Sequence, residues 1–207
     1  MQTDTSVTVR SFVHSAYSVL DWKHAEVLLS YQFSQAYVDV LNVLFQFRLY
    51  RSDILAEGGS RSPMSKGIET PLTYLGWEKR TFDIQLFVNE KPHLSYQRRI
   101  DHYKDGVALE VEWNSKEEFF DRDLEKFRLL YQLNLISAGI IITRGDSLQH
   151  LFKELRKSHK LKGTKFGTTT TQMGKLEQKI HAGGGAGCPI LVFGITEALY
   201  IDQKEGA

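Results

Sequence analysis

Short runs of alternating apolar and polar residues are separated by stretches in which apolar residues recur every three or four positions. Alternation predicts strands, because successive side chains of a strand point to opposite faces. Helical spacing predicts helices with one buried face. The expected strands cover residues 7–13, 82–88, 107–113, 138–143 and 189–195, and the expected helices cover residues 22–29, 34–47, 119–135 and a segment that follows Asp146. This succession of strands and helices predicts an α/β fold.

Turn and cap signals refine these boundaries. Ser34 is expected to cap the helix that it begins. Ser62 stands before Pro63 and predicts a further helix start, with proline at the first helical position. Pro71 then predicts a kink or a short break in that helix, because proline lacks the N–H that a helix interior needs. Residues 91–93, with the sequence Lys-Pro-His, predict a turn between two strands.

Three carboxylates gather around one expected hairpin. Asp105-Gly106 readily adopts the backbone conformation of a tight turn, which folds Asp101 back toward Glu110. Glu110 and Glu112 share one face of the second strand, about 7 Å apart. Such alternation is also typical of a solvated strand face, but the apolar Trp113 follows at once. Charge beside buried surface needs a partner, and hard oxygen ligands of this kind suit Mg²⁺.

The segment DHYKDGVALEVEW resembles the metal-binding motif of type II restriction endonucleases of the BglII, BstYI and BamHI group, which belong to the PD-(D/E)xK superfamily. Other stretches of the chain resemble further strands of these enzymes, among them GWEKRTFDIQLFV and AGIIITR. The resemblance implies a restriction-endonuclease-like core, with a central mixed β-sheet flanked by helices. It also implies a homodimeric, Mg²⁺-dependent endonuclease that cuts palindromic double-stranded DNA, with a cognate DNA methyltransferase in the same restriction-modification system.

The resemblance assigns roles to the acidic residues. Asp101, Glu110 and the carbonyl of Val111 would hold Mg²⁺, which lowers the pKa of the attacking water and stabilises the charge that develops on the phosphate. Many nucleases of this fold have lysine where this chain has Glu112. Glu112 would therefore either accept a proton from the water or ligate a second metal ion. Both alternatives remain open, as does the number of ions.

Residues 158–187 form a long polar segment that is rich in lysine and threonine. Long loops are often functional, and lysines and hydroxyls suit contacts with phosphates and base edges. The alternative is a solvated surface loop. By the resemblance, this segment and the end of the catalytic strand would contact DNA. The candidate DNA-binding residues are Asn114, Lys116, Thr169, Thr170 and Gln172.

Composition sets the remaining expectations. A chain of 207 residues predicts a single domain over residues 1–207. Its net charge of +1 excludes a general basic field, so DNA contacts must come from local patches. Cys188 is the only cysteine, which excludes an intrachain disulfide, and its apolar surroundings predict a buried thiol. The chain has no long apolar span, so we expect a cytoplasmic protein without membrane contact.

Two other functions compete with the restriction enzyme. A repair or junction-resolving nuclease on the same core would cut by DNA structure rather than by sequence. A non-catalytic DNA-binding module would keep the fold without the chemistry. The three carboxylates, Asp101, Glu110 and Glu112, favour an enzyme over the second alternative.

Overall fold

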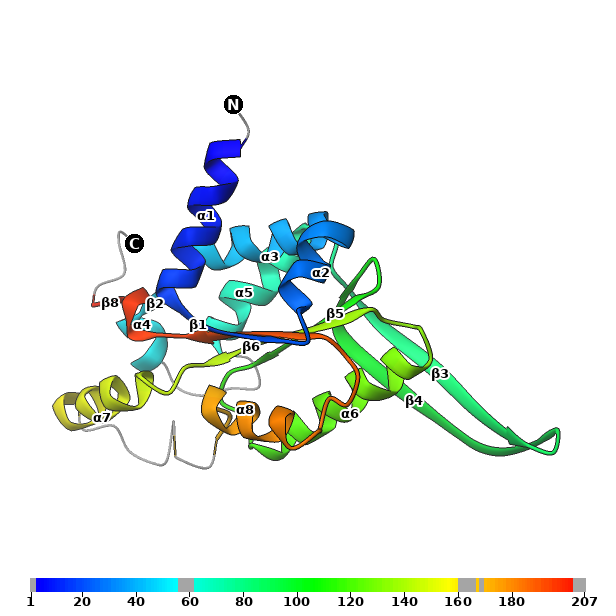
Figure 1. The fold of residues 1–207 in the computed structure, drawn as a ribbon. Helices are drawn as coiled ribbons and strands as arrows, with labels where there is room; N and C mark the ends of the chain where they lie inside the picture. Colours follow the sequence, from blue (N-terminus) through cyan, green and yellow to red (C-terminus); the bar gives the residue numbers. More distant parts are fainter. Residues whose placement is uncertain (1–2, 56–61, 160–166, 168–169, 203–207) are drawn as a thin grey trace.

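A six-stranded mixed sheet forms the centre of the molecule (Figure 1). The computed structural model describes residues 3–55, 62–159, 167 and 170–202. The strand order is β1-β7-β6-β5-β4-β3, in which β5, β6 and β7 are parallel and the other pairs are antiparallel. The strands are β1 (Tyr17–Trp22), β3 (Glu78–Val88), β4 (Lys91–Lys104), β5 (Val107–Glu112), β6 (Ala138–Arg144) and β7 (Ile190–Ile195).

Helices cover both faces of this sheet (Figure 1). One face packs against α1 (Thr3–Ala16), α2 (Ala25–Gln32), α3 (Ser34–Gln46) and α5 (Pro63–Tyr74), and the same apolar core includes residues of α4 (Arg51–Leu55) and α7 (Leu148–His159). The other face packs against α6 (Glu118–Gln132) and α8 (Met173–His181). A small parallel pair joins β2 (Leu49–Tyr50) to β8 (Tyr200–Ile201), which follows the short helix η1 (Glu197–Leu199). The predicted α/β fold, with a central mixed sheet flanked by helices, is confirmed.

The predicted first strand over residues 7–13 is wrong, because this segment belongs to helix α1. Val9, Val13 and Ala16 are spaced by four and three residues, so they fall on one helical stripe, and all three are buried. Val7, which alternation placed on the same side as Val9, is 62% exposed. The first strand of the sheet is instead β1, which ends at Trp22, so the next helix begins later than predicted.

The helix caps follow the predictions only in part. Ser62 caps α5 as expected, since its hydroxyl accepts a hydrogen bond from the backbone N–H of Ser65. The helix continues through Pro71 to Tyr74, so the predicted break is absent. Ser34 is the first residue of α3 rather than its cap, and the capping position is taken by Phe33 without a side-chain hydrogen bond.

The β3–β4 hairpin turns earlier than the sequence predicts. Residues 91–93 lie within β4, and the turn is formed by Asn89 and Glu90, whose φ values are 48° and 63°. Asparagine tolerates this left-handed conformation better than most residues, whereas proline cannot adopt it. Pro92 is accommodated next to a shift in strand register between Leu86 and Phe87. β3 begins at Glu78, before the predicted strand of residues 82–88, and ends with it at Val88.

The polar segment of residues 158–187 contains helix α8, which the sequence analysis missed. Met173, Leu176 and Ile180 have helical spacing and are buried against the sheet. The predicted strand at residues 189–195 is confirmed as β7, with all six of its residues buried. Cys188 is a buried free thiol, as expected. None of the described helices is long and apolar enough to cross a membrane.

Candidate active site

A tight turn between β4 and β5 places Asp101 beside Glu110. Asp105 and Gly106 form this turn with φ values of 48° and 87°, as the sequence predicts. Lys104 pairs with Val107, and the register continues through His102 and Leu109. The next position in this register sets Asp101 opposite Glu110, and the charge of Asp101 acts on Glu110.

Asp101 also lies at a β-bulge. On the β3 side of β4, Glu78 pairs with Tyr103 and Arg80 pairs with Ile100, so Lys79 faces both Asp101 and His102. A bulge bends its strand and redirects side chains, and bulges occur often next to active sites. The extra residue thus changes the direction of β4 at the position where the sequence predicts a metal ligand.

Glu110 and Glu112 lie on the same side of β5, as predicted, but that side is not solvated. Helix α6 covers it, so Glu110 is 2% exposed and Glu112 is 5% exposed. The alternative of a solvated face on β5 is therefore wrong, because helices cover both of its faces. Gly139, the partner of Ala108 in the β5–β6 register, has no side chain and leaves room for Phe127 of α6 to approach closely.

Lys126 of α6 supplies a buried positive charge to this acidic strand. Its Nζ lies 2.5 Å from Glu110 Oε1 and 2.9 Å from Asp123 Oδ1, and its side chain is only 7% exposed. The sequence analysis missed both Lys126 and Asp123. A signal was present, because Phe120, Asp123 and Phe127 are spaced at helical intervals, which puts a carboxylate on the apolar stripe of α6.

Glu112 is less completely compensated. Its Oε1 lies 3.4 Å from Arg122 Nη2, and the Arg122 side chain is 51% exposed. Neither Glu112 Oε2 nor Asp123 Oδ2, both buried, has a hydrogen-bond partner in the described part of the chain. Two carboxylate oxygens therefore lie in the protein interior with unused capacity to accept a proton, a hydrogen bond or a cation.

Burial and mutual repulsion shift the pKa values of these groups. Burial raises the pKa of Glu110 to about 7, although the nearby Lys126 opposes the shift. Burial raises the pKa of Glu112 to about 8, and the charge of Asp123 adds to this effect. Burial favours the neutral amine of Lys126, but Glu110 and Asp123 outweigh it and raise the pKa of the ammonium group. Lys126 thus remains charged at neutral pH.

A basic cleft of about 540 Å³ opens onto this cluster between the base of the β3–β4 hairpin and α6. Asp101 and Lys126 both line it, so the buried cluster has access to solvent. Arg99 Nε lies 3.4 Å from Asp101 Oδ1. The lining residues are Thr81, Gln97, Arg98, Arg99, Asp101, Arg122, Glu125 and Lys126. Four cations and two carboxylates give the cleft a positive balance that suits a phosphodiester backbone.

The predicted DNA-contact residues that the structure describes gather past the end of β5. Asn114 and Lys116 are exposed, and Lys116 forms an isolated antiparallel bridge with Thr170. The Thr170 hydroxyl accepts a hydrogen bond of 2.6 Å from Arg144 Nη2. Gln172 immediately precedes α8. Thr169 lies outside the described residues. Four of the five candidates are therefore placed, and the bridge brings two of them together.

A central mixed sheet flanked by helices, with an acidic hairpin beside a basic cleft, is the arrangement of a restriction-endonuclease-like fold. The family model for restriction endonuclease BglII/BglIII matches residues 17–195, and the chain belongs to this family. A search of curated proteins found no match. Membership implies type II site-specific cleavage of DNA, so the protein is a DNA-cleaving hydrolase whose substrate is DNA.

Proposed function

We propose that this protein is a Mg²⁺-dependent endonuclease that cuts both strands of a palindromic DNA site as a homodimer. The observation that carries the proposal is the cluster of Asp101, Glu110 and Glu112 with Lys126, which opens onto a basic cleft. Family membership supports DNA cleavage, and the cluster supports the metal and the position of the reacting phosphate. Each chain offers one such site, so a two-fold pair of chains matches a two-fold DNA site.

The donor set of the cluster has the chemistry that Mg²⁺ requires. Carboxylate and peptide oxygens are hard ligands. Burial raises the pKa values of Glu110 and Glu112, so both are partly protonated at neutral pH, and binding of a cation would release these protons. Among the described residues, no group of three or more His, Cys, Asp or Glu side chains is placed to hold a metal ion. The proposed set does not need three acids, because it combines Asp101 and Glu110 with the carbonyl of Val111.

In this proposal, Asp101, Glu110 and the Val111 carbonyl hold the ion. When bound, Mg²⁺ supplies a more acidic water and neutralises charge on the phosphate. Glu112 either accepts the proton of the attacking water or contributes to a second metal site, and its oxygen without a hydrogen-bond partner suits both roles. Arg99 and Arg122 line the cleft and would contact the phosphates on either side of the cut.

Lys126 completes the site from the helix. A lysine contributes a fixed positive charge that stabilises the additional negative charge of the transition state. In this chain Glu112 stands at the strand position where many nucleases of the fold have lysine, while Lys126 reaches Glu110 from α6. We therefore assign the stabilising charge to Lys126, and Glu112 keeps the two roles given above.

Three further parts of the proposal concern DNA and partners. Asn114, Lys116, Thr170 and Gln172 would contact DNA beside the end of β5, and Thr169 would join them from outside the described residues. A cognate DNA methyltransferase would protect the host sites. The site of action would be the cytoplasm, where both enzymes meet DNA.

The test is digestion of methylation-free phage DNA by the purified full-length protein with Mg²⁺ and with EDTA. Glu110→Ala should abolish cleavage, whereas Glu118→Ala, which removes an exposed glutamate at the start of α6, should leave it intact. Discrete fragments with identical ends that require both Mg²⁺ and Glu110 are expected. Cleavage confined to branched DNA would support a structure-specific repair nuclease. Sequence-specific binding without any cleavage would support a non-catalytic module.

A further inference from the structure

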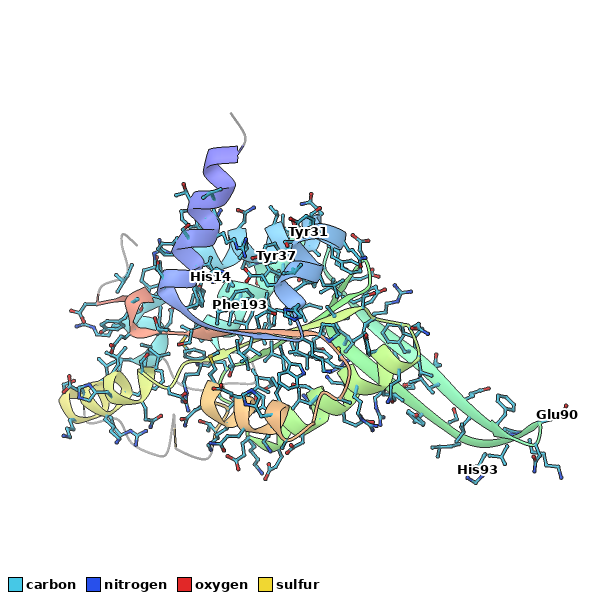
Figure 2. All side chains as sticks on the ribbon, in the orientation of Figure 1. His14, Tyr31, Tyr37, Glu90, His93 and Phe193 are labelled. Carbon is cyan, nitrogen blue, oxygen red and sulfur yellow. The ribbon has the colours of Figure 1, made fainter. Side chains whose placement is uncertain are left out.

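Beyond the bulge at Asp101, the β3–β4 hairpin extends away from the sheet as an arm of residues 80–100. Figure 2 shows its tip, with Glu90 and His93, far from the body of the molecule. Every residue from 85 to 95 is exposed. An isolated two-stranded ribbon is only marginally stable in water, so a ribbon of this length on a small protein is expected to bind a partner.

The strand register divides the arm into two rows of side chains. Thr81 pairs with Arg99, Asp83 with Gln97, and Gln85 with Ser95. Because side chains alternate between faces, these six residues form one polar row. The pairs between them form the opposite, more apolar row, which contains Phe82, Ile84, Leu86, Leu94, Tyr96 and Arg98. The two faces of the arm therefore differ in chemistry.

The polar row continues directly into the candidate active site. Thr81, Gln97 and Arg99 line the same cleft as Asp101 and Lys126, and Arg98 of the opposite row joins them at the base of the arm, where it pairs with Glu125 of α6. The arm also carries four Lys or Arg against two Asp or Glu, a net charge of +2, whereas the whole chain carries +1. Outside the arm the chain is thus slightly acidic, which makes the arm the more attractive surface for a polyanion.

We propose that the polar row of this arm enters the major groove of DNA and reads base edges next to the cut phosphate. The major groove admits a two-stranded ribbon, and glutamine, arginine, serine and threonine are side chains that read bases there. From Thr81 to Gln85 the row extends about 13 Å, which corresponds to about four base pairs. The inference rests on the proposed function, since it takes the cleft as the place where DNA is cut.

Two side chains are the strongest candidates for base contacts. Gln85 is exposed at the end of the row nearer the tip of the arm, and its amide can pair with an adenine edge. Gln97 is held in place because its Nε2 donates a hydrogen bond of 2.7 Å to Asp83 Oδ1. The second amide hydrogen and the carbonyl oxygen of Gln97 would pair with a base edge, and a side chain already held by Asp83 loses little entropy on binding.

The experiment selects bound duplexes from a randomised pool in the presence of Ca²⁺ and reads the preferred sequence directly, so it does not depend on cleavage. The full-length protein should select a defined motif. Gln85→Ala and Gln97→Ala should each relax one position of that motif by about tenfold in enrichment and leave the others unchanged. Leu94→Ala, on the apolar row of the same arm, is the matched control and should keep the motif. Thermal melting verifies that each variant is folded.

Identical motifs from the parent protein and both glutamine variants would overturn the arm proposal, as would a parent protein that selects no motif. A Leu94→Ala variant that becomes monomeric, while both glutamine variants keep the motif, would make the arm a contact between two copies of the chain instead. A selected motif without cleavage of phage DNA would contradict the proposed nuclease function, while the comparison of glutamine variants would still decide the role of the arm.

Discussion

Replacing Lys126 with methionine removes the buried cation and keeps a side chain of similar length. Glu110 and Asp123, which are 2% and 0% exposed, then lose the ammonium group that lies 2.5 Å and 2.9 Å from their oxygens. Breaking one side of a buried ion pair costs roughly 3–5 kcal/mol, because the remaining charge is left uncompensated. We expect a loss of that size in the free energy of unfolding at pH 8.5, where Glu110 is ionised in the parent protein.

The same variant should lose less stability at lower pH. Burial already raises the pKa of Glu110 to about 7, and removal of Lys126 raises it further, so Glu110 takes up a proton on folding. At pH 6 the carboxyl group is neutral in the folded variant, and the loss should fall to about 1–2 kcal/mol. Denaturant unfolding in EDTA at both pH values measures the difference.

A second substitution provides the control for this prediction. Adding Glu110→Gln to the Lys126→Met variant removes the uncompensated carboxylate and should recover much of the loss at pH 8.5. An equal loss at pH 6 and pH 8.5, or no recovery in the double variant, would refute the reasoning that Lys126 serves to neutralise Glu110.

Two further predictions concern the same strand pair. Burial raises the pKa of Glu112 to about 8, so the folded state binds more protons than the unfolded state between about pH 5 and pH 8. The free energy of unfolding in EDTA should therefore fall by roughly 2–4 kcal/mol as the pH rises through that range. Glu112→Gln should flatten this pH profile, which denaturant unfolding measures. A variant as pH-dependent as the parent would contradict this. A Cβ on Gly139 would lie 2.3 Å from Phe127 Cδ2, so Gly139→Ala should destabilise the protein by about 1–3 kcal/mol. Gly76→Ala is the control, because a Cβ there meets no atom within 4 Å. With a φ of +85° at Gly76, that variant should show only the cost of backbone strain.

The sheet could be predicted from sequence where one period dominates. β6 is apolar from Ala138 to Ile142 and buried over its whole length, and the turn at Asp105-Gly106 follows from its residue types alone. Residues 7–13 fit two periods at once, since Val9 and Val13 satisfy both alternation and helical spacing. The packing of α1 against the core settles the choice, and local sequence contains no information on that packing.

The candidate site, like the sheet, could be predicted from the sequence only in part. Asp101, Glu110 and Glu112 follow from a hairpin, in which a turn and a period fix the relative positions of residues close in sequence. Lys126 comes from α6, and its distance from Glu110 depends on how that helix packs on the sheet. Gly139 permits this packing, because a Cβ at that position would lie 2.3 Å from Phe127 Cδ2. The sequence analysis placed Glu112 at the strand position where many nucleases have lysine and named no buried cation, whereas the structure shows that Lys126 brings one from α6.

The position of Lys126 bears on how the site can work. A lysine on β5 would be fixed by the strand, whereas Lys126 reaches Glu110 through a long side chain from α6 and is held there by two carboxylates. Under the proposed function, a cation bound by Glu110 would compete with that ion pair, and Lys126, which lines the cleft, would then be able to contact the phosphate. Under the same proposal, a glutamate can stand at the strand position where many nucleases of the fold have lysine, because the positive charge would come from Lys126 on α6 instead.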